Sequence, residues 1–373
     1  MSSHSKAPVV PSNPFIEQEF GSVEGLLEFC HRLPKLELHA HVNGSIPPEA
    51  LRQLAEKRAS ETVDKGEAAK GALSVLDAIA WKSEFDIKDF FPLFKHIYGL
   101  TNDPESLTFV MHSVITDFEN DGVRYIELRS TPRDDPSTGL TKESYIQSLL
   151  SAISTSPAKN ISVKLIVSID RRHTPEVAQH IVDLAIKYRD QGVVGIDLCG
   201  DPYAGDFDAG PKDAIVRAKA AGLKVTLHLA EIQNRDEENR SMLSVFPDRL
   251  GHATYMSDDV RDKVYKDGIP IEMCMTSNVL SRTVESYEVH HIKQALEENH
   301  PSVLCTDDKG IISSPLSYEY ALAASTFSMT KRLLYDLSRR SINAIFADDI
   351  EKARLADLWQ AWADREFSRA TNS

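Results

Sequence analysis

Short apolar runs recur along the chain, and each is followed by a segment in which apolar residues repeat at three and four positions. Such runs are typical of strands buried on both faces, and the longer periodicity is typical of helices with one buried face. The helical pattern is clear over residues 104–122 and 175–192, and both segments end in Gly, a common helix terminator. We expect strands at residues 35–41, 124–130, 161–170, 193–200, 223–231, 248–254, 269–278 and 302–308.

The alternation of eight strands with helices predicts a parallel sheet, because each helix returns the chain to the edge at which the strand began. Eight strands close a (β/α)8 barrel, the TIM barrel. A doubly wound open sheet is the alternative, but no Gly-x-Gly-x-x-Gly motif follows the first strand. The sequence therefore predicts an α/β protein that forms one TIM-barrel domain over residues 1–373.

The connection between the first and second strands is much longer than an ordinary loop of a barrel. We expect residues 47–105 to form a helical insertion that covers the mouth of the barrel like a lid. The charged stretch AEKRASETVDKGEAAKGALS could equally be a surface insertion without a function. Residues 85–100 are more apolar, and we expect them to cover part of the barrel. Residues 315–369 should form helices that pack on the outside of the barrel.

The chain has 373 residues, is 42% hydrophobic and carries a formal net charge of −14. Non-specific binding of nucleic acids requires a basic face, so we expect no nucleic-acid partner, although local donors can still hold a small anion. No segment has the pattern of a signal peptide or is apolar enough for a membrane span, so we expect no membrane partner. No interface pattern indicates more than a monomer.

The four cysteines form no Cys-x-x-Cys motif, and three of them lie inside apolar strand-like runs. Buried reduced thiols are common in such positions. The cysteines therefore favour a reducing, cytosolic location over a disulfide framework or a metal site.

Four residues with metal-binding side chains lie at the ends of separate apolar runs. His39 and His41 share the run KLELHAH, and their spacing places both imidazoles on one face of a strand. His228 lies in KVTLHLAE and Asp307 in SVLCTDDKG. In a TIM barrel the carboxyl ends of the strands meet at the catalytic face, so these side chains should converge there. Three imidazoles and a carboxylate predict one divalent metal ion, most plausibly zinc.

The arrangement favours a catalytic over a structural zinc site, because structural zinc usually has Cys-rich ligands close together in the sequence. Zinc lowers the pKa of its bound water to about 7 and so provides a nucleophile at neutral pH. Glu231 could donate a proton beside the metal if the chain turns after Leu229, and His252 could hold or take the proton of the water. Taken alone, Glu231 could be a charge at a helix N-terminus, His252 a buried core residue and Asp308 a solvated surface group.

Several motifs together resemble one known family. They are LPKLELHAHVNGSI, YIELRSTPR, GIDLCGDP, LHLAE, DRLGHAT, TSN and CTDDKG, and the resemblance covers residues 33–346. The chain resembles the adenosine and AMP deaminases among the amidohydrolase barrels. This resemblance implies hydrolytic attack at C6 of an aminopurine and loss of the amine. The cytidine deaminases are excluded because their Pro-Cys-x-x-Cys signature does not occur here.

The resemblance also assigns roles to individual residues. His39, His41, His228 and Asp307 would bind one zinc ion. The catalytic residues would be Glu231, which protonates purine N1, and His252, which aligns the attacking hydroxide. Asp308 would bind N7, and the backbone amide of Gly200 would face N3.

HAHVNGS, RSTPR, IDRR and TDDKG resemble an adenosine deaminase-like subgroup whose members convert N6-methyl-AMP to methylamine and IMP. Typical adenosine deaminases have Asp where this chain has Asn43, and an amide, unlike a carboxylate, can donate to a 5′-phosphate. The subgroup has His at the position of Tyr98, whose hydroxyl could still reach a phosphate. The implied substrate-binding set is His41, Asn43, Tyr98, Ser130, Thr131, Pro132, Arg133, Asp170, Gly200, Glu231 and Asp308.

Three other functions compete with this hypothesis. A deaminase of free adenosine or adenine would use the same metal, and Asn43 is the main feature against it. Another metal hydrolase of the same fold would often use a bridging carboxylated Lys, but Lys164 lies in the middle of its strand. A non-catalytic binding protein would not need the zinc ligands together with Glu231 and His252.

Overall fold

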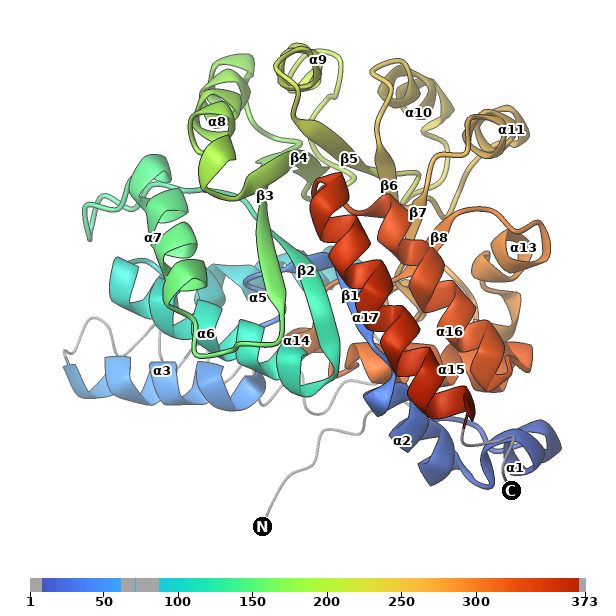
Figure 1. Ribbon diagram of the computed structural model, residues 1–373. Helices are drawn as coiled ribbons and strands as arrows, with labels where there is room; N and C mark the ends of the chain where they lie inside the picture. The colour runs from blue at the N-terminus through green and yellow to red at the C-terminus, as the bar shows by residue number, and fades with distance from the viewer. Residues whose placement is uncertain (1–8, 62–70, 72–86, 369–373) are drawn as a thin grey trace.

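The computed structural model describes residues 9–61, 71 and 87–368. Eight strands form one parallel sheet in the order β1 to β8, so that each strand pairs with the next along the chain (Figure 1). The strands are β1 (Lys35–His41), β2 (Val123–Ser130), β3 (Ser162–Asp170), β4 (Val193–Cys199), β5 (Lys224–Leu229), β6 (Arg249–His252), β7 (Ile271–Met273) and β8 (Ser302–Leu304).

The sheet closes where the chain after β8 meets β1. The amide of His41 donates to the carbonyl of Asp307 at 3.0 Å, and the amide of Asp307 donates to the carbonyl of His39 at 2.8 Å. A parallel bridge between Ala40 and Asp307 completes this contact. The predicted (β/α)8 barrel is confirmed.

The expected strand over residues 269–278 was wrong in its second half. β7 ends at Met273, and helix α12 (Met275–Leu280) follows at once. The buried carboxylate of Glu319 accepts the amide of Thr276 at 3.1 Å, which satisfies one of the free donors at the start of the helix. The strand expected over residues 302–308 is also shorter and ends at Leu304. Beyond it, the amide of Thr306 donates to the carboxylate of Glu37 at 2.9 Å and not to a neighbouring strand.

Helices surround the barrel (Figure 1). The α-helices are α1 (Pro14–Phe20), α2 (Val23–Arg32), α3 (Pro48–Glu61), α5 (Ile87–Leu100), α6 (Pro104–Asn120), α7 (Lys142–Thr155), α8 (Pro175–Lys187), α9 (Lys212–Ala220), α10 (Asp236–Leu243), α11 (Asp258–Asp267), α12 (Met275–Leu280), α13 (Ile292–Glu297), α14 (Lys309–Ile312), α15 (Leu316–Phe327), α16 (Lys331–Arg340) and α17 (Asp349–Phe367). Short 3-10 turns are η1 (Arg189–Gln191), η2 (Tyr287–Val289) and η3 (Ser341–Ala344).

Local sequence fixes where the helices that flank β2 begin. Asp103 accepts the amide of Ser106, and the Ser106 hydroxyl accepts the amide of Asp103, so two free donors at the start of α6 are satisfied. Thr141 and Ser144 form the same reciprocal pair at the start of α7. The first cap fixes the start of the helix that precedes β2, and the second fixes the end of the loop that follows β2.

The interior of the barrel below its carboxyl end holds charged side chains that pair with one another. Arg129 lies 3.2 Å from Asp197 and 2.8 Å from Glu272. Arg249 lies 2.6 Å from Glu272 and 2.7 Å from Glu127. All five are fully buried, and each charge has an opposite partner, as burial of ions requires. This network forms a rigid polar floor beneath the mouth of the barrel.

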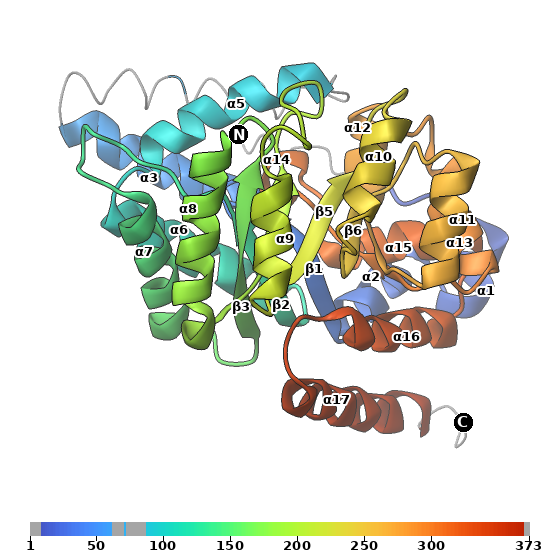
Figure 2. The same cartoon turned by 90° about the horizontal axis from the view of Figure 1, so that it is seen from above.

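The described part of the predicted insertion consists of α3 and α5. Figure 2 shows α5 at one end of the molecule and α17 at the other. Of the expected insertion over 47–105, residues 62–70 and 72–86 lie outside the described residues. That the insertion acts as a lid stays a prediction.

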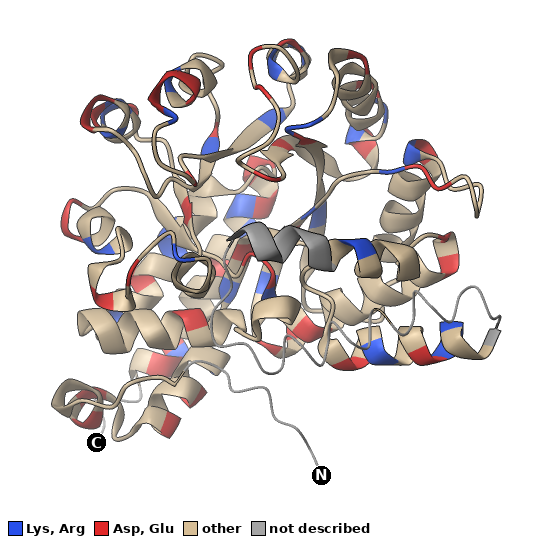
Figure 3. Ribbon diagram, turned by 180° about the vertical axis from the view of Figure 1, so that it is seen from behind, with Lys and Arg blue, Asp and Glu red and all other residues tan. Residues whose placement is uncertain are grey.

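Charged residues of both signs are interspersed over the outer helices in the view of Figure 3. In the part of the chain that the structure describes, no helix combines the length and the apolar character needed to cross a membrane.

Candidate active site

Side chains from three separate parts of the barrel meet at the carboxyl end of the strands. Nε2 of His41 lies 3.2 Å from Nε2 of His228 and 3.4 Å from Oδ1 of Asp307, which itself lies 3.5 Å from Nε2 of His39. Ligand atoms about 2.1 Å from a tetrahedral zinc ion stand about 3.4 Å apart. The spacing of these donors therefore suits one zinc-sized ion.

The rings of His39 and His228 are held by buried carboxylates on the side away from the mouth. Nδ1 of His39 lies 2.6 Å from Glu272, and Nδ1 of His228 lies 3.0 Å from Asp197. A carboxylate accepts, so Nδ1 carries the proton and the lone pair of Nε2 faces the site. Nε2 of His39 is buried and makes no hydrogen bond to the described residues. This orphaned atom and the mixed nitrogen and oxygen donors fit a metal ion.

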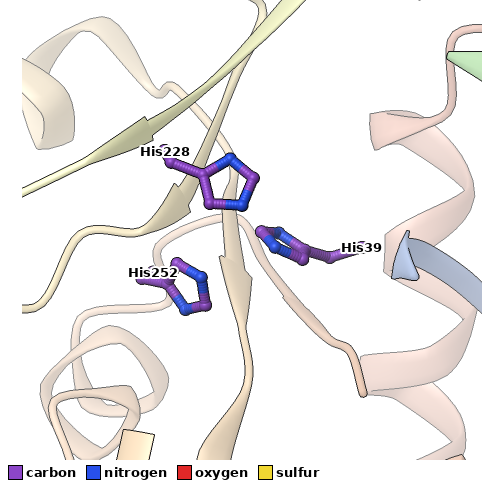
Figure 4. A group of neighbouring side chains, drawn as sticks. All are labelled: His39, His228 and His252. Carbon is purple, nitrogen blue, oxygen red and sulfur yellow. The ribbon is translucent and has the colours of Figure 1, made fainter. Parts of the chain in front are cut away.

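His252 joins the same group from the end of β6. Figure 4 shows the rings of His39, His228 and His252 around a common space. The ring centroid of His39 lies 4.5 Å from that of His228 and 4.7 Å from that of His252. Nε2 of His252 lies 3.8 Å from Asp307 and 3.9 Å from Glu231, so His252 lies beside the candidate metal ligands.

The backbone leaves its strands in left-handed conformations at this end of the barrel. Ala230, His252 and Asp307 have φ of 56°, 59° and 64°, which are uncommon values for residues other than Gly. β5 ends at Leu229, so the turn expected after this residue is present and brings the carboxyl of Glu231 to the site.

Burial sets the protonation of the side chains around the candidate metal. Burial raises the pKa of Glu231 above its usual value, which favours a carboxyl that can donate a proton. Burial also lowers the pKa of His252 well below its usual value, which favours the neutral ring. The pKa of Asp308 is raised well above its usual value by burial and by the neighbouring charge of Asp307.

The candidate metal ligands open into a cavity of about 350 Å³, a volume suited to a small ligand. Nine members of the expected substrate-binding set line this cavity: His41, Asn43, Tyr98, Ser130, Thr131, Asp170, Gly200, Glu231 and Asp308. Pro132 and Arg133 are not part of the lining.

Arg133 lies behind the cavity wall because its guanidinium is already engaged. The Cζ atom lies 4.6 Å from the ring centre of Tyr98 and 4.8 Å from that of Tyr145. The guanidinium donates to the hydroxyl of Tyr145 at 3.1 Å and to that of Thr101 at 2.6 Å. Arg133 therefore joins α5 to α7 and orients Tyr98, which reaches the cavity.

Asn43 lies in a buried polar cluster at one wall of the cavity. Its Oδ1 accepts from Thr101 at 3.2 Å, and its Nδ2 donates to Tyr145 at 3.4 Å. The hydroxyls of Ser130 and Tyr145 lie 2.7 Å apart. The sequence did not indicate Thr101 or Tyr145 as members of this cluster. Tyr145 has the spacing of an ordinary core residue on an amphipathic helix.

Asp170 and Gly200 form a second wall. Arg172 donates to the two carboxylate oxygens of Asp170 at 2.8 and 2.6 Å, and also lines the cavity. Gly200 has φ of 102°, and a Cβ there would lie 2.8 Å from Cγ of Asp170. Only Gly combines this backbone conformation with so close a carboxylate.

The chain is similar in sequence and in structure to known proteins of one family. The family described as adenosine deaminase matches residues 34–362. N6-Methyl-AMP deaminase of Mus musculus is 41% identical over 349 residues, which cover 90% of this chain and 93% of that protein. The solved apo structure of the N6-methyl-AMP deaminase from Arabidopsis thaliana is 36% identical, with a TM-score of 0.82 over 90% of this chain and 98% of that one. The structure of an Arabidopsis relative complexed with IMP has a TM-score of 0.84 at 36% identity. The match covers 91% of this chain and 99% of that chain.

The eight-stranded parallel barrel carries at its carboxyl end a cluster of histidines and an aspartate that could hold a metal ion, and the comparisons identify the chain as a hydrolase. The family match covers most of the chain, and the chain belongs to the adenosine deaminase family.

Proposed function

We propose that this protein is a zinc-dependent N6-methyl-AMP deaminase that converts N6-methyl-AMP, and related N6-substituted purine nucleoside monophosphates, to IMP and the free amine. The relatives that carry this activity in their names span nearly the same length as this chain. The observation that carries the proposal is the presence in one cavity of a metal-binding group and of Asn43 in place of a carboxylate.

His39, His41, His228 and Asp307 would hold the zinc ion. Bound there, zinc would supply a water molecule of lowered pKa as the nucleophile. Glu272 and Asp197 keep the protons of His39 and His228 on Nδ1, so that both rings present lone pairs toward the ion. Asp307 accepts from the hydroxyl of Ser277 at 2.7 Å, which fixes the carboxylate in one orientation.

The residues around this centre divide the work on the purine. Glu231, whose pKa is raised by burial, would donate a proton to N1 as the nucleophile adds to C6. His252 would hold the nucleophile by a hydrogen bond. Asp308, whose protonated form is favoured by burial, would donate to N7, and the amide of Gly200 would face N3.

The phosphate would lie at the wall formed by Asn43. Its amide, the hydroxyl of Ser130 and the hydroxyl of Tyr98 are donors, and the cavity is also lined by the cations of Lys95 and Arg172. A neutral, donor-rich wall with nearby cations suits a dianion, whereas a carboxylate at position 43 would repel it.

We infer that the enzyme works as a cytosolic monomer. All four cysteines are free and buried, as expected in a reducing compartment.

The test is incubation of the purified, zinc-loaded protein with N6-methyl-AMP, followed by chromatography of the nucleotide and mass spectrometry of the amine. We expect IMP and methylamine in equal amounts, with loss of both products after removal of the metal by a chelator. If the zinc-loaded protein releases no methylamine, the proposal is contradicted.

A further inference from the structure

A chain of hydrogen bonds runs behind His252, away from the substrate cavity. Nε2 of His290 lies 3.1 Å from Oδ1 of Asn278, and Nδ2 of Asn278 lies 3.2 Å from Nδ1 of His252. All three side chains are buried, with exposed fractions of 1%, 2% and 5%. On the opposite side of the ring, Nε2 of His252 faces Glu231 and Asp307.

A backbone amide determines which atoms donate and which accept in this row of hydrogen bonds. The amide of Ile292 donates to Nδ1 of His290 at 3.1 Å. A backbone N–H can only donate, so Nδ1 of His290 is an acceptor. Burial and the neighbouring His291 keep the pKa of His290 well below its usual value, so the ring is neutral. The single proton of His290 therefore lies on Nε2.

This proton sets the orientation of the Asn278 amide. The Nε2–H of His290 needs an acceptor, which only Oδ1 of Asn278 provides in this pairing. The NH2 group of Asn278 then faces His252, and it also lies 3.3 Å from the hydroxyl of Thr283. Because an amide NH2 donates, Nδ1 of His252 is an acceptor and cannot carry a proton.

We propose that Asn278, oriented by His290, is a positioning residue that holds His252 as the Nε2–H tautomer. The ring then presents a hydrogen-bond donor to the reaction site, where Nε2 lies 3.8 Å from Asp307. In this tautomer Nε2 has no lone pair, so His252 orients the nucleophile by donation and does not take its proton. The consequence for catalysis rests on the proposed function; the tautomer itself does not.

Asn278→Asp replaces the NH2 group that faces His252 by a carboxylate oxygen, with almost no change in the shape of the side chain. A carboxylate accepts from both neighbours, so it should draw the proton of His252 to Nδ1. Two-bond 1H–15N correlation spectra of the zinc-loaded, 15N-histidine-labelled protein report the tautomer, and the signals of His252 are identified by their loss in His252→Asn. We expect Nε2–H in the wild type and a proton on Nδ1 in the variant. A wild-type proton on Nδ1, or the same tautomer in both proteins, would overturn the proposal.

Turnover provides the second measurement. We expect Asn278→Asp to reduce kcat by about 10²-fold, with KM and zinc content little changed. His290→Gln keeps a donor for Asn278 and should retain more activity than His290→Leu. His300→Leu is the control, because His300 is also a buried ring but donates to the carbonyl of Ile269, away from the site. Equal losses of kcat in all three histidine variants would contradict the proposal. If the wild type turns over no substrate, the proposed function fails while the tautomer measurement still decides this inference.

Discussion

Glu272 accepts the Nδ1 proton of His39 at 2.6 Å, and both side chains are fully buried. The same carboxylate pairs with Arg129 and Arg249, so one residue joins the candidate metal centre to the charged floor of the barrel. His39 is thus positioned from below by the interior of the barrel, whereas Asp307 lies beyond the end of β8 and its carboxylate accepts from Ser277 of α12.

Glu272→Gln should weaken zinc binding. An amide can place its NH2 toward Nδ1 of His39, and even in its better orientation it is a weaker acceptor than a carboxylate. We expect a 10- to 100-fold loss of zinc affinity, measured by competition with a chromophoric chelator. Thr226→Val is the matched control, because Thr226 donates to the other oxygen of Glu272 at 2.9 Å and not to a metal ligand. Equal affinities of Glu272→Gln and the wild type would contradict this account of His39.

Glu231→Gln should abolish proton donation while leaving the metal in place. Gln has nearly the same shape as Glu, but its amide cannot act as an acid at N1. We expect kcat to fall by about 10²-fold or more with an unchanged zinc content, determined by elemental analysis. Normal turnover by this variant would show that Glu231 is not the proton donor.

Asn43→Asp should discriminate between phosphorylated and unphosphorylated substrates. The new carboxylate would stand close to the 5′-phosphate, and like charges placed together cost several kcal/mol. We expect kcat/KM for nucleotides to fall by about 10²-fold or more, with a much smaller effect on nucleosides. Equal losses for both classes would show that Asn43 does not lie near the phosphate.

Glu319 should make stability depend on pH. Burial raises its pKa to about 7, against the opposing hydrogen bonds from Ser314 and Thr276, whereas the ordinary value is 4.5. Between these two values the folded protein keeps a proton that the unfolded chain has released, so the free energy of unfolding falls as pH rises. The shift corresponds to about 3 kcal/mol over this range.

Glu319→Gln should remove this dependence, because Gln can accept from Thr276 and donate to Ser314 without a charge. Urea unfolding of both proteins at pH 5 and pH 8 measures it. We expect the wild type to lose more stability than the variant between the two pH values. The same loss in both proteins would mean that Glu319 does not titrate in this range.

The sequence predicted those features of the fold that depend on local pattern. Apolar runs located every strand, and the His-x-His spacing identified His39 and His41 because alternation alone puts both rings on one face. The start of α12 could not be predicted, because the carboxylate that caps it belongs to Glu319, 43 residues further along the chain. Strand 7 was therefore extended to residue 278.

The same limit applies to the candidate site. Asn278 was placed at a strand end, whereas its contact with His290 across a turn gives it an orientation that no spacing rule contains. Tyr145 was missed because its hydroxyl reaches Asn43 and Ser130 only after α7 packs against the barrel. Side chains that meet through packing, and not through strand alternation, require the structure.

The most direct test of the central claim is a comparison of kcat/KM for N6-methyl-AMP, AMP, N6-methyladenosine and adenosine with the zinc-loaded wild-type protein. The account predicts the highest value for N6-methyl-AMP, with IMP as the product, and little or no turnover of the two nucleosides. A preference for adenosine or N6-methyladenosine over their 5′-phosphates would contradict the assignment of the Asn43 wall as the phosphate site.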